Sequence, residues 1–222
     1  MASFTISNSD ILRAVSSSTE EQALSFDPSK KVVRFPAWVD FEIFSNVKPL
    51  RNNEKNFKIL FIGSVTDRKK PHLIVEAMNN FNSKDIKLYI VGPTPNENYL
   101  SQLKKLVQEY DLVDQVSFTG SIDRKSVMDH YADTNLMILP SVSEGLARVI
   151  FESQVTACPV LVTDAPGMGD IVIDGQTGYI FESDNLESLT SKIQEIKNNY
   201  QDAIHVGTVS YTHLRAHETV LH

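Results

Sequence analysis

The stretch that decides the fold is Pro140-Ser141-Val142-Ser143-Glu144-Gly145-Leu146-Ala147-Arg148-Val149-Ile150-Phe151-Glu152, which has a short apolar run on each side. The run before it is Leu136-Met137-Ile138-Leu139, and the run after it is Pro159-Val160-Leu161-Val162. Such runs predict buried strands, and the stretch between them predicts a loop followed by a helix. Strand, helix and strand in this order indicate a parallel sheet, whose ligands bind beside the carboxyl ends of the strands. We therefore expect the functional site at this loop.

Two carboxylates mark the loop and its helix, Glu144 before the helix and Glu152 about one turn into it. The backbone N–H groups of Ala147, Arg148 and Val149 would be unpaired at the helix N-terminus, where the helix dipole favours an anion. Positions four apart lie on one face of a helix, so Glu144, Arg148 and Glu152 could point to the same side, with the anion site between the two carboxylates. A diphosphate, a ribose diol and a sugar polyol occur together in a nucleotide-sugar, which this arrangement would suit.

The net charge of the chain argues against nucleic acid as a partner. There are 28 acidic and 21 basic residues among 222, which gives a formal charge of −7. Binding to a phosphate backbone needs a basic face, and none is visible in the sequence. With 41% hydrophobic and 22% charged residues, the chain is typical of a globular protein with one full domain and part of another.

Cysteine usage and hydropathy exclude several further classes of protein. Cys158 is the single cysteine, which excludes an internal disulfide and multi-cysteine zinc sites, so we expect it in the core. No apolar run approaches the ~18 to 20 residues of a membrane span. Residues 1–7 lack the basic and apolar parts of a signal peptide. We expect a cytoplasmic protein without a transmembrane segment, and peripheral contact with the inner face of the membrane stays open.

Strand and helix patterns alternate from residue 57 onward. Strands are expected at 57–62, 86–91, 116–118, 136–139, 160–163 and 178–181, and helices at 71–80, 99–110 and 124–132, after residue 146 and from 184 onward. Asp184 with Glu187 three positions later predicts a capping box at the start of the last helix. The alternation predicts one α/β domain, over residues 57–206, with a parallel sheet covered on both faces.

The residues before this domain are too few to bury a core of their own. Helix-capping residue types at 7–10 predict a helix with Ile11, Leu12 and Val15 on one face, a polar stretch follows at 16–29, and residues 32–35 predict a strand that Pro36 ends. We interpret residues 1–36 as the end of a preceding N-terminal, acceptor-binding domain and 37–56 as a polar interdomain linker.

The last residues break the pattern. Residues 209–219 show no clean helical or strand period, and four of the six histidines lie at or after His205. A metal-binding tail is one interpretation, but the spacings are irregular. The string also resembles the translation of a widely used sequencing adapter, so we interpret residues 207–222 as a non-native tail produced by read-through.

Several motifs occur together in one order along the chain. They are Phe35-Pro36 through Phe44, Ile59 to Lys70, Val91-Gly92, Val116 to Gly120, Leu139-Pro140-Ser141, the two glutamates, and Asp174 to Gly178. Taken together, these motifs resemble the second domain of a two-domain, GT-B fold glycosyltransferase of the retaining family 4, over roughly residues 7–199. The resemblance implies a Rossmann-like, doubly wound parallel sheet that binds a nucleotide-diphosphate-sugar.

The resemblance also implies a role for individual residues. Glu144 would hold hydroxyls of the transferred sugar and Glu152 the ribose hydroxyls, while Lys69 takes the place of the family's phosphate-binding lysine. The donor-binding residues implied in addition are Gly63, Ser64, Arg68, Ser121, Ile122, Ala147, Arg148 and Val149. The amides of Arg148 and Val149 would face the diphosphate, and the backbone near Ser121 and Ile122 would meet the base. His72 and His130 are expected to be surface or packing residues.

Three positions depart from the family pattern. Ser64 stands where the family usually has an arginine, which would cost a charge-assisted contact of roughly 1.5 to 3 kcal/mol unless Arg68 or Lys70 reaches the same oxygens. Ala147 replaces a common glycine and still permits a helix start. Ala37-Trp38 replaces Asn-Gly or a similar pair in the linker, so we expect a stiffer hinge.

The implied reaction is retaining transfer of a hexosyl group from the donor to a carbohydrate or lipid-linked acceptor, as in glycan or polysaccharide synthesis. Catalysis would stabilise the charge that develops on the leaving diphosphate. The sequence has no Asp-x-Asp pair, so no metal and no other cofactor are expected. The acceptor would bind through the missing domain, so we expect this chain alone to be inactive.

Two other classes of protein stay open as alternatives to a transferase. A non-catalytic nucleotide-sugar-binding module is favoured by Ser64 and by the missing half. A flavodoxin-like receiver would share the strand and helix alternation, but it needs clustered acids after its first strand, where this chain has Gly63-Ser64. Neither a P-loop nor a Gly-x-Gly-x-x-Gly turn follows that strand, so nucleotide hydrolysis and dinucleotide redox chemistry lack support.

Overall fold

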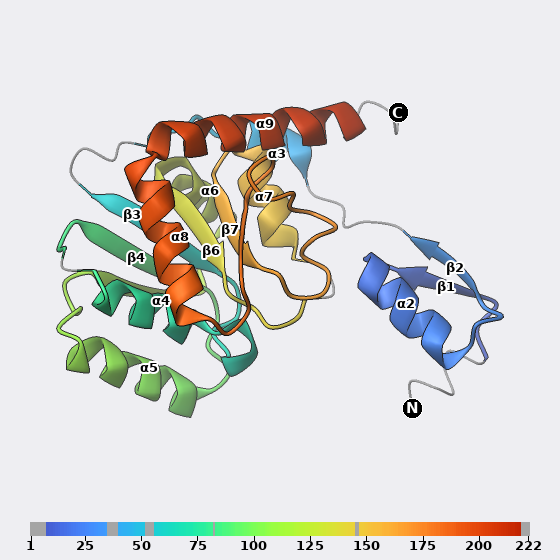
Figure 1. Cartoon of the computed structure of the whole chain (residues 1–222), viewed down its shortest axis with the longest axis horizontal. Helices are drawn as coiled ribbons and strands as arrows, with labels where there is room; N and C mark the ends of the chain where they lie inside the picture. Colours follow the sequence, from blue (N-terminus) through green and yellow to red (C-terminus); the bar gives the residue numbers. More distant parts are fainter. Residues whose placement is uncertain (1–7, 35–39, 52–55, 82, 145–146, 219–222) are drawn as a thin grey trace.

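The computed structural model describes residues 8–34, 40–51, 56–81, 83–144 and 147–218. Its main feature is a six-stranded sheet in which every neighbouring pair of strands is parallel (Figure 1). The strands are β3 (Phe57–Ile62), β4 (Ile86–Val91), β5 (Val116–Gly120), β6 (Leu136–Leu139), β7 (Val160–Thr163) and β8 (Tyr179–Phe181). The predicted α/β class and all six predicted strands are confirmed.

The strand order is β5-β4-β3-β6-β7-β8, which is the doubly wound arrangement of a Rossmann-like sheet. The chain builds outward from β3 to β5 on one side, and then returns to place β6 against the other side of β3. β3 pairs with β6 through Ile59 and Leu136 and through Leu60 and Met137. The point between β3 and β6 is therefore the topological switch point, where a crevice opens at the carboxyl ends of the strands.

Nine segments of helix accompany the strands in the described ranges. They are α2 (Ser17–Phe26), α3 (Phe41–Ser45), the 3-10 helix η1 (Asp67–Lys69), α4 (Pro71–Asn79), α5 (Glu97–Glu109), α6 (Arg124–Asp133), α7 (Arg148–Val155), α8 (Leu186–Asn198) and α9 (Tyr200–Glu218). α4 contacts α5 and α8, and α7 contacts α3 and α9, so that helices flank the sheet (Figure 1). All residues of β6 and β7 are buried between these layers, as their uninterrupted apolar runs predicted.

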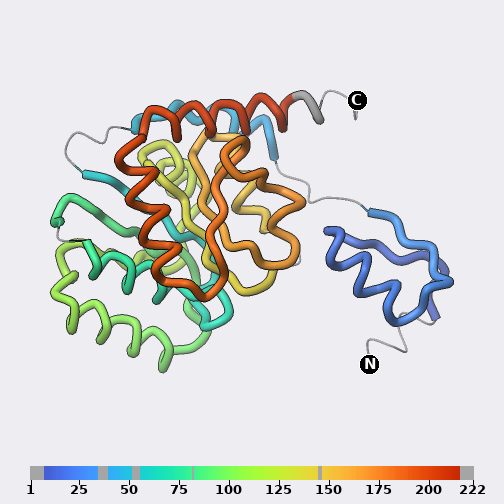
Figure 2. The backbone as a smooth tube through the Cα atoms, in the orientation of Figure 1, coloured from blue at the N-terminus to red at the C-terminus, as the bar shows by residue number. Residues whose placement is uncertain are grey.

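The N-terminal residues form a small unit beside the main domain, seen in blue in Figure 2. Here the predicted helix over Ile11, Leu12 and Val15 is wrong, because residues 11–14 form strand β1, which pairs in parallel with β2 (Lys31–Arg34). The helix lies instead in the polar stretch, as α2. Ser16 and Thr19 form a capping box at its start, which gives this polar segment a defined beginning that hydrophobic periodicity does not report.

The linker is attached to the main domain at Arg51. The Arg51 guanidinium donates to three backbone carbonyls, those of Thr134 at 2.8 Å, Thr156 at 2.7 Å and Tyr131 at 3.2 Å. These carbonyls lie at the carboxyl ends of α6 and α7, where helix carbonyls have no partner within the helix. Arg51 therefore fastens the linker to both helices. The predicted stiff hinge at Ala37-Trp38 lies outside the described residues.

The C-terminal end corrects two details. The cap of α8 is Asn185, whose side chain accepts from the Ser188 N–H, rather than the predicted Asp184. Regular structure also continues past residue 206, since α9 runs on to Glu218. Gly207 lies so close to the Ala157 carbonyl that a Cβ there would be 2.4 Å from its oxygen, and Tyr211 stacks on Phe41 at 5.9 Å. These tertiary contacts hold a helix whose own sequence has little periodicity, while the origin of residues 207–222 stays a prediction.

Candidate functional site

Two glycines bring the carboxyl ends of β3 and β4 close together. Gly63 directly follows β3 with φ +145°, and Gly92 directly follows β4 with φ +136°. A Cβ on Gly92 would lie 2.1 Å from the Gly63 carbonyl oxygen, so only glycine fits there. The chain is thus turned sharply at the switch point, and the loop after β3 is directed across it.

The predicted catalytic pair, Lys69 and Glu144, meets at this crevice. Lys69 Nζ donates to Glu144 Oε1 at 2.8 Å, and the two side chains are 13% and 9% exposed. The end of the Lys69 side chain lies over Gly63, since a Cβ at that glycine would be 3.3 Å from Nζ. The pair joins η1 with the loop before α7, two segments 75 residues apart in the sequence. Both residues were predicted at the site from the sequence, but their ion pair was not.

The side chains near Ser64 show which cation could take the place of the arginine missing at residue 64. Arg68 lies beside Glu144, with its NH1 3.6 Å from Oε1, and it also donates to the Ser143 carbonyl. Lys70 instead pairs with Asp184. Of the two cations that could replace the arginine missing at residue 64, Arg68 therefore lies at the crevice, with a side chain that is 51% exposed.

Helix α7 begins at Arg148 without a capping side chain. Its N-cap residue is Ala147, which has no hydroxyl or carboxyl to accept from the first N–H groups. By contrast α5, α6 and α8 are capped by the side chains of Asn96, Asp123 and Asn185. An uncapped first turn keeps backbone donors available for an anion. Gly145 and Leu146, which belong to the predicted loop, lie outside the described residues.

A cavity of about 560 Å³ opens beside this helix start. Its walls come from the end of β3, the first turns of α6 and α7, and the segment around α3. The lining residues are Asp40, Phe44, Ile62, Ile122, Arg124, Val127, Arg148, Val149 and Glu152. Five of the lining residues are apolar, and Arg148 and Glu152 supply charge at positions four apart on one face of α7.

Glu152 is held in the wall of this cavity by a tyrosine. The Tyr131 hydroxyl donates to Glu152 Oε2 at 3.1 Å and lies 3.2 Å from the Val149 carbonyl oxygen. Burial raises the pKa of the Glu152 carboxyl above its usual value of 4.5, while the Tyr131 hydrogen bond and the charges of Arg148 and Arg124 lower it. The carboxylate is therefore desolvated and only partly compensated, as expected of a group that accepts hydrogen bonds from a ligand.

The structure gathers the predicted residues into two adjoining groups. Ile122, Arg148, Val149 and Glu152 line the cavity, and Lys69, Arg68, Gly63 and Glu144 lie together beside it. Ile62, which lines the cavity, directly precedes Gly63 and so connects the groups. Ala147 is buried at the start of α7, Ser64 is half-buried, and Ser121 is exposed; these three and Glu144 are not among the lining residues.

Several residues of the cavity wall had no role predicted from the sequence. Asp40 and Phe44 belong to a quoted motif, so their presence in the motif was the available signal. Arg124 donates to Asp40 Oδ2 at 2.8 Å and lies over the Phe44 ring at 5.7 Å. Nothing in the local sequence of Arg124 indicates this contact, because it spans 84 residues.

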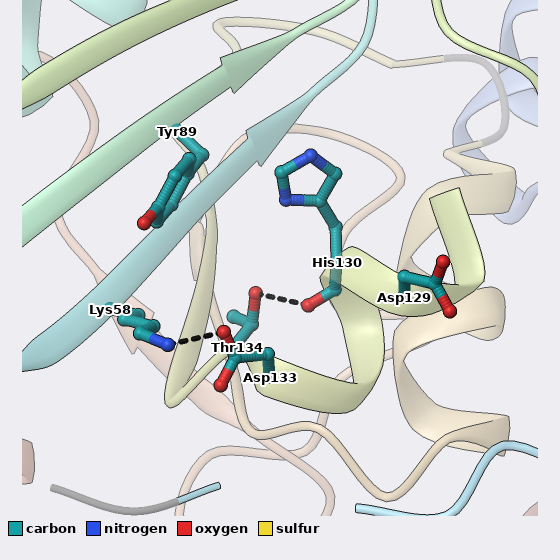
Figure 3. Close-up of a pocket in the computed structure, with 6 residues that line it drawn as sticks. All are labelled: Lys58, Tyr89, Asp129, His130, Asp133 and Thr134. Carbon is teal, nitrogen blue, oxygen red and sulfur yellow. Dashed lines mark hydrogen bonds and ion pairs between the residues drawn. The ribbon is translucent and has the colours of Figure 1, made fainter. Parts of the chain in front are cut away.

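A second, smaller cavity lies toward the amino end of β3 (Figure 3). Its volume is about 210 Å³, and it includes Lys58 paired with Asp133, and His130 with its ring 5.3 Å from that of Tyr89. Burial lowers the pKa of His130 below its usual value, with Asp133 and Asp129 opposing the shift. His130 is a packing residue, as expected, and the paired charges of this cavity point to no ligand.

Comparison with known proteins decides the family. A model of the family described as glycosyl transferases group 1 matches residues 42–208, which is most of the chain and includes every predicted site residue. The chain belongs to this glycosyltransferase family. A relative, the capsular polysaccharide biosynthesis glycosyltransferase CapM of Staphylococcus aureus, is 27% identical over 154 residues, or 65% of this chain and 37% of that protein.

Solved glycosyltransferases share the fold. Sucrose-phosphate synthase of Thermosynechococcus elongatus superposes with a TM-score of 0.86 at 23% identity, over 96% of this chain and 55% of that one. The Anabaena protein HepE, solved in complex with UDP-glucose, gives a TM-score of 0.81 at 15% identity, over 92% and 58%. The predicted GT-B type of Rossmann-like sheet is confirmed. The chain spans about half the length of the curated relatives it matches.

The described ranges offer neither a membrane span nor a cluster of metal ligands. None of the helices there is long and apolar enough to cross a bilayer. In the same ranges, His, Cys, Asp and Glu side chains form no group of three or more that could hold a metal ion. That the reaction needs no metal stays a prediction.

Proposed function

We propose that this chain binds the nucleotide-diphosphate-sugar donor of a retaining, family 4 glycosyltransferase. The observation that carries the proposal is the cavity at the switch point, which has Glu152 in its wall, the uncapped start of α7 beside it, and the ion pair of Lys69 and Glu144 next to both. A nucleoside, a diphosphate and a sugar would meet these three features in that order.

Each part of the donor has a matching group. Glu152 would accept from the ribose hydroxyls, while Ile122 and the backbone at Ser121 would meet the base. The amides of Arg148 and Val149 would face the diphosphate, because helix N-termini bind anions. The turn at Gly63 and Ser64 would let the diphosphate approach the backbone closely.

Lys69 and Glu144 would act at the reacting end. Lys69 has three N–H donors and gives one to Glu144, so two are available to phosphate oxygens. Glu144 would accept from the sugar hydroxyls while it keeps Lys69 in place. When the bond between the sugar and the diphosphate breaks, negative charge grows on the leaving phosphate, and Lys69, Arg68 and the α7 amides would stabilise it. No step of this scheme requires a metal.

The acceptor side is proposed from the relatives. The acceptor oxygen would attack from the face that the diphosphate leaves, with retention of configuration at the transferred hexose. A glycan or polysaccharide acceptor agrees with the described role of CapM in capsular polysaccharide synthesis. We propose that the acceptor binds to a separate domain outside the sheet described here, so the chain alone should bind donor weakly and transfer no sugar.

Calorimetric titration tests donor binding directly. The chain is titrated with UDP, GDP, UDP-glucose and GDP-mannose, with and without EDTA, and thermal unfolding is followed in parallel. We expect at least one of them to bind and to raise the melting temperature, and EDTA to leave binding unchanged. Glu152→Gln should weaken binding, while Glu187→Gln, an exposed acid on α8, should not. If no nucleotide binds the unmodified chain, the proposal loses its basis.

A non-catalytic nucleotide-sugar-binding module is the second candidate. It is favoured by Ser64, which brings no charge to the position where the family usually has an arginine. The two functions differ in their need for Glu144 during transfer. In a longer form that includes an acceptor-binding half, the enzyme should lose sugar transfer with Glu144→Gln, whereas a module without catalysis would show no transfer that this change could remove.

A further inference from the structure

Tyr131 is a fully buried residue of α6 for which the sequence pattern predicts no role. Its hydroxyl lies between two groups of α7, 3.1 Å from Glu152 Oε2 and 3.2 Å from the Val149 carbonyl oxygen. Its ring packs edge-on against Phe44, with 6.0 Å between the ring centres. Both ends of the side chain are therefore fixed, and the hydroxyl is held at the cavity wall.

The hydroxyl has one proton and two acceptors within reach. A carboxylate is a stronger acceptor than a backbone carbonyl, so the proton is directed to Glu152. Burial raises the pKa of the Tyr131 hydroxyl well above its usual value, with the charge of Glu152 as a further cause, so Tyr131 stays a donor. In the described part of the chain, no hydrogen bond to Glu152 Oε1 is present, which leaves that oxygen to the cavity that Glu152 lines.

We propose that Tyr131 is a positioning residue for donor binding: its hydroxyl fixes Glu152 Oε2 so that the rest of the carboxylate faces the ribose diol. The inference rests on the proposed donor site. Without the hydroxyl, the carboxylate would rotate and would lose the neutral donor that holds Oε2. Tyr131 then acts on the nucleotide only through Glu152, and only on the part of the nucleotide that Glu152 contacts.

The charges around Glu152 determine the expected pH dependence. Arg148 faces it from α7, Arg124 from α6, and Asp40 lies behind Arg124 as its ion-pair partner. The Tyr131 hydrogen bond lowers the pKa of Glu152 against the rise that burial causes. Ribose binding needs the ionised carboxylate, so affinity falls as the pH falls through this pKa. Removal of the hydroxyl raises the pKa and moves that loss of affinity to higher pH.

The test compares Tyr131→Phe with Tyr200→Phe, which makes the same change at another buried tyrosine, one that packs on Phe57 and lies outside the cavity lining. The probes are whichever of UDP and GDP binds more tightly and its 2′,3′-dideoxy analogue, titrated by calorimetry across the acidic range. We expect Tyr131→Phe to weaken binding of the ribonucleotide about five- to tenfold. Binding of the dideoxy analogue and all binding by Tyr200→Phe should change less than about twofold.

Each alternative result is decisive. If Tyr131→Phe weakens both nucleotides equally, or neither, Tyr131 has no positioning role and the inference is overturned. A carbon-13 titration of the Glu152 carboxyl in the unliganded protein serves as a second measurement that needs no nucleotide. It should show a higher pKa in Tyr131→Phe than in the unmodified chain, and an unchanged pKa would also overturn the inference. If UDP and GDP fail to bind the unmodified chain, the proposed function fails while this titration still judges the contact.

Discussion

The ion pair between Lys69 and Glu144 allows a quantitative test. Its two side chains are almost buried, at 13% and 9% exposed, and its atoms are 2.8 Å apart. Removal of one partner from a buried pair leaves an uncompensated charge, which costs about 3 kcal/mol at the low end. In Lys69→Met, Arg68 remains 3.6 Å from Glu144 but is 51% exposed, so it offsets about 1 kcal/mol.

We therefore expect Lys69→Met to lower the free energy of unfolding by about 2 kcal/mol. For a domain of this size that corresponds to a fall of about 4 to 8 °C in melting temperature. Glu144→Gln should cost less, about 1 kcal/mol, because the lysine that remains can extend toward solvent. In the double variant no buried charge is left unpaired, so its cost should also be about 1 kcal/mol rather than the sum of the single costs.

The assay is urea unfolding of the four proteins of this cycle, with Lys70→Met and Asp184→Asn as a matched cycle. Lys70 and Asp184 also form an ion pair, but Asp184 is 57% exposed, so its coupling should be small. Additive costs in the first cycle, with a coupling below about 0.5 kcal/mol, would refute the reasoning. Such a result would mean that Glu144 is solvated and that the two residues do not act as a unit.

Three further expectations concern stability. Glu152→Gln should raise the free energy of unfolding at neutral pH, because burial raises the pKa of Glu152 and so makes its ionised form unfavourable in the folded protein. This gain in stability should vanish near pH 4.5, and a gain that does not depend on pH would show that burial of the charge is not its cause. Gly92→Ala should lower the free energy of unfolding in denaturant by at least about 3 kcal/mol, since a Cβ on residue 92 would lie 2.1 Å from a carbonyl oxygen. Gly120→Ala should lower it by only about 1 kcal/mol, since a Cβ on residue 120 meets nothing within 4 Å. Arg51→Met should lower the free energy of unfolding by about 2 to 4 kcal/mol, and Arg51→Lys by nearly as much, because an ammonium cannot reproduce the guanidinium's contacts with three carbonyls. If lysine restored full stability, the charge alone would matter.

The sheet could be predicted because its strands are short and fully apolar. Residues such as Leu136 to Leu139 have no exposed face, so their pattern is the same whatever packs on them. The prediction for the N-terminal unit was wrong for the opposite reason. Ile11 is 55% exposed and α2 has no buried residue, so hydrophobic periodicity had little to report, and the capping box at Ser16 was the usable signal.

The site could be predicted only where function depends on residue type at a fixed offset from a strand or helix. Glu152 and the start of α7 follow from the pattern after β6, and the structure places them in one cavity. The contacts of Tyr131 and Arg124 with their partners span 21 and 84 residues, and no local rule predicts them. Long-range contacts of this kind depend on the strand order, which periodicity does not give.

The segment that was expected to be only a linker forms part of the cavity. Asp40 and Phe44 line it, Phe44 packs on Tyr131, and Arg51 holds the carboxyl ends of α6 and α7, which also contribute lining residues. A displacement of this segment would change the cavity wall and the support of Tyr131 together. Because coupling between binding and conformation is reciprocal, a nucleotide that prefers the arrangement described here also stabilises this position of the segment. Under the proposed function, donor binding and the position of this segment would then be linked through the contact of Phe44 with Tyr131.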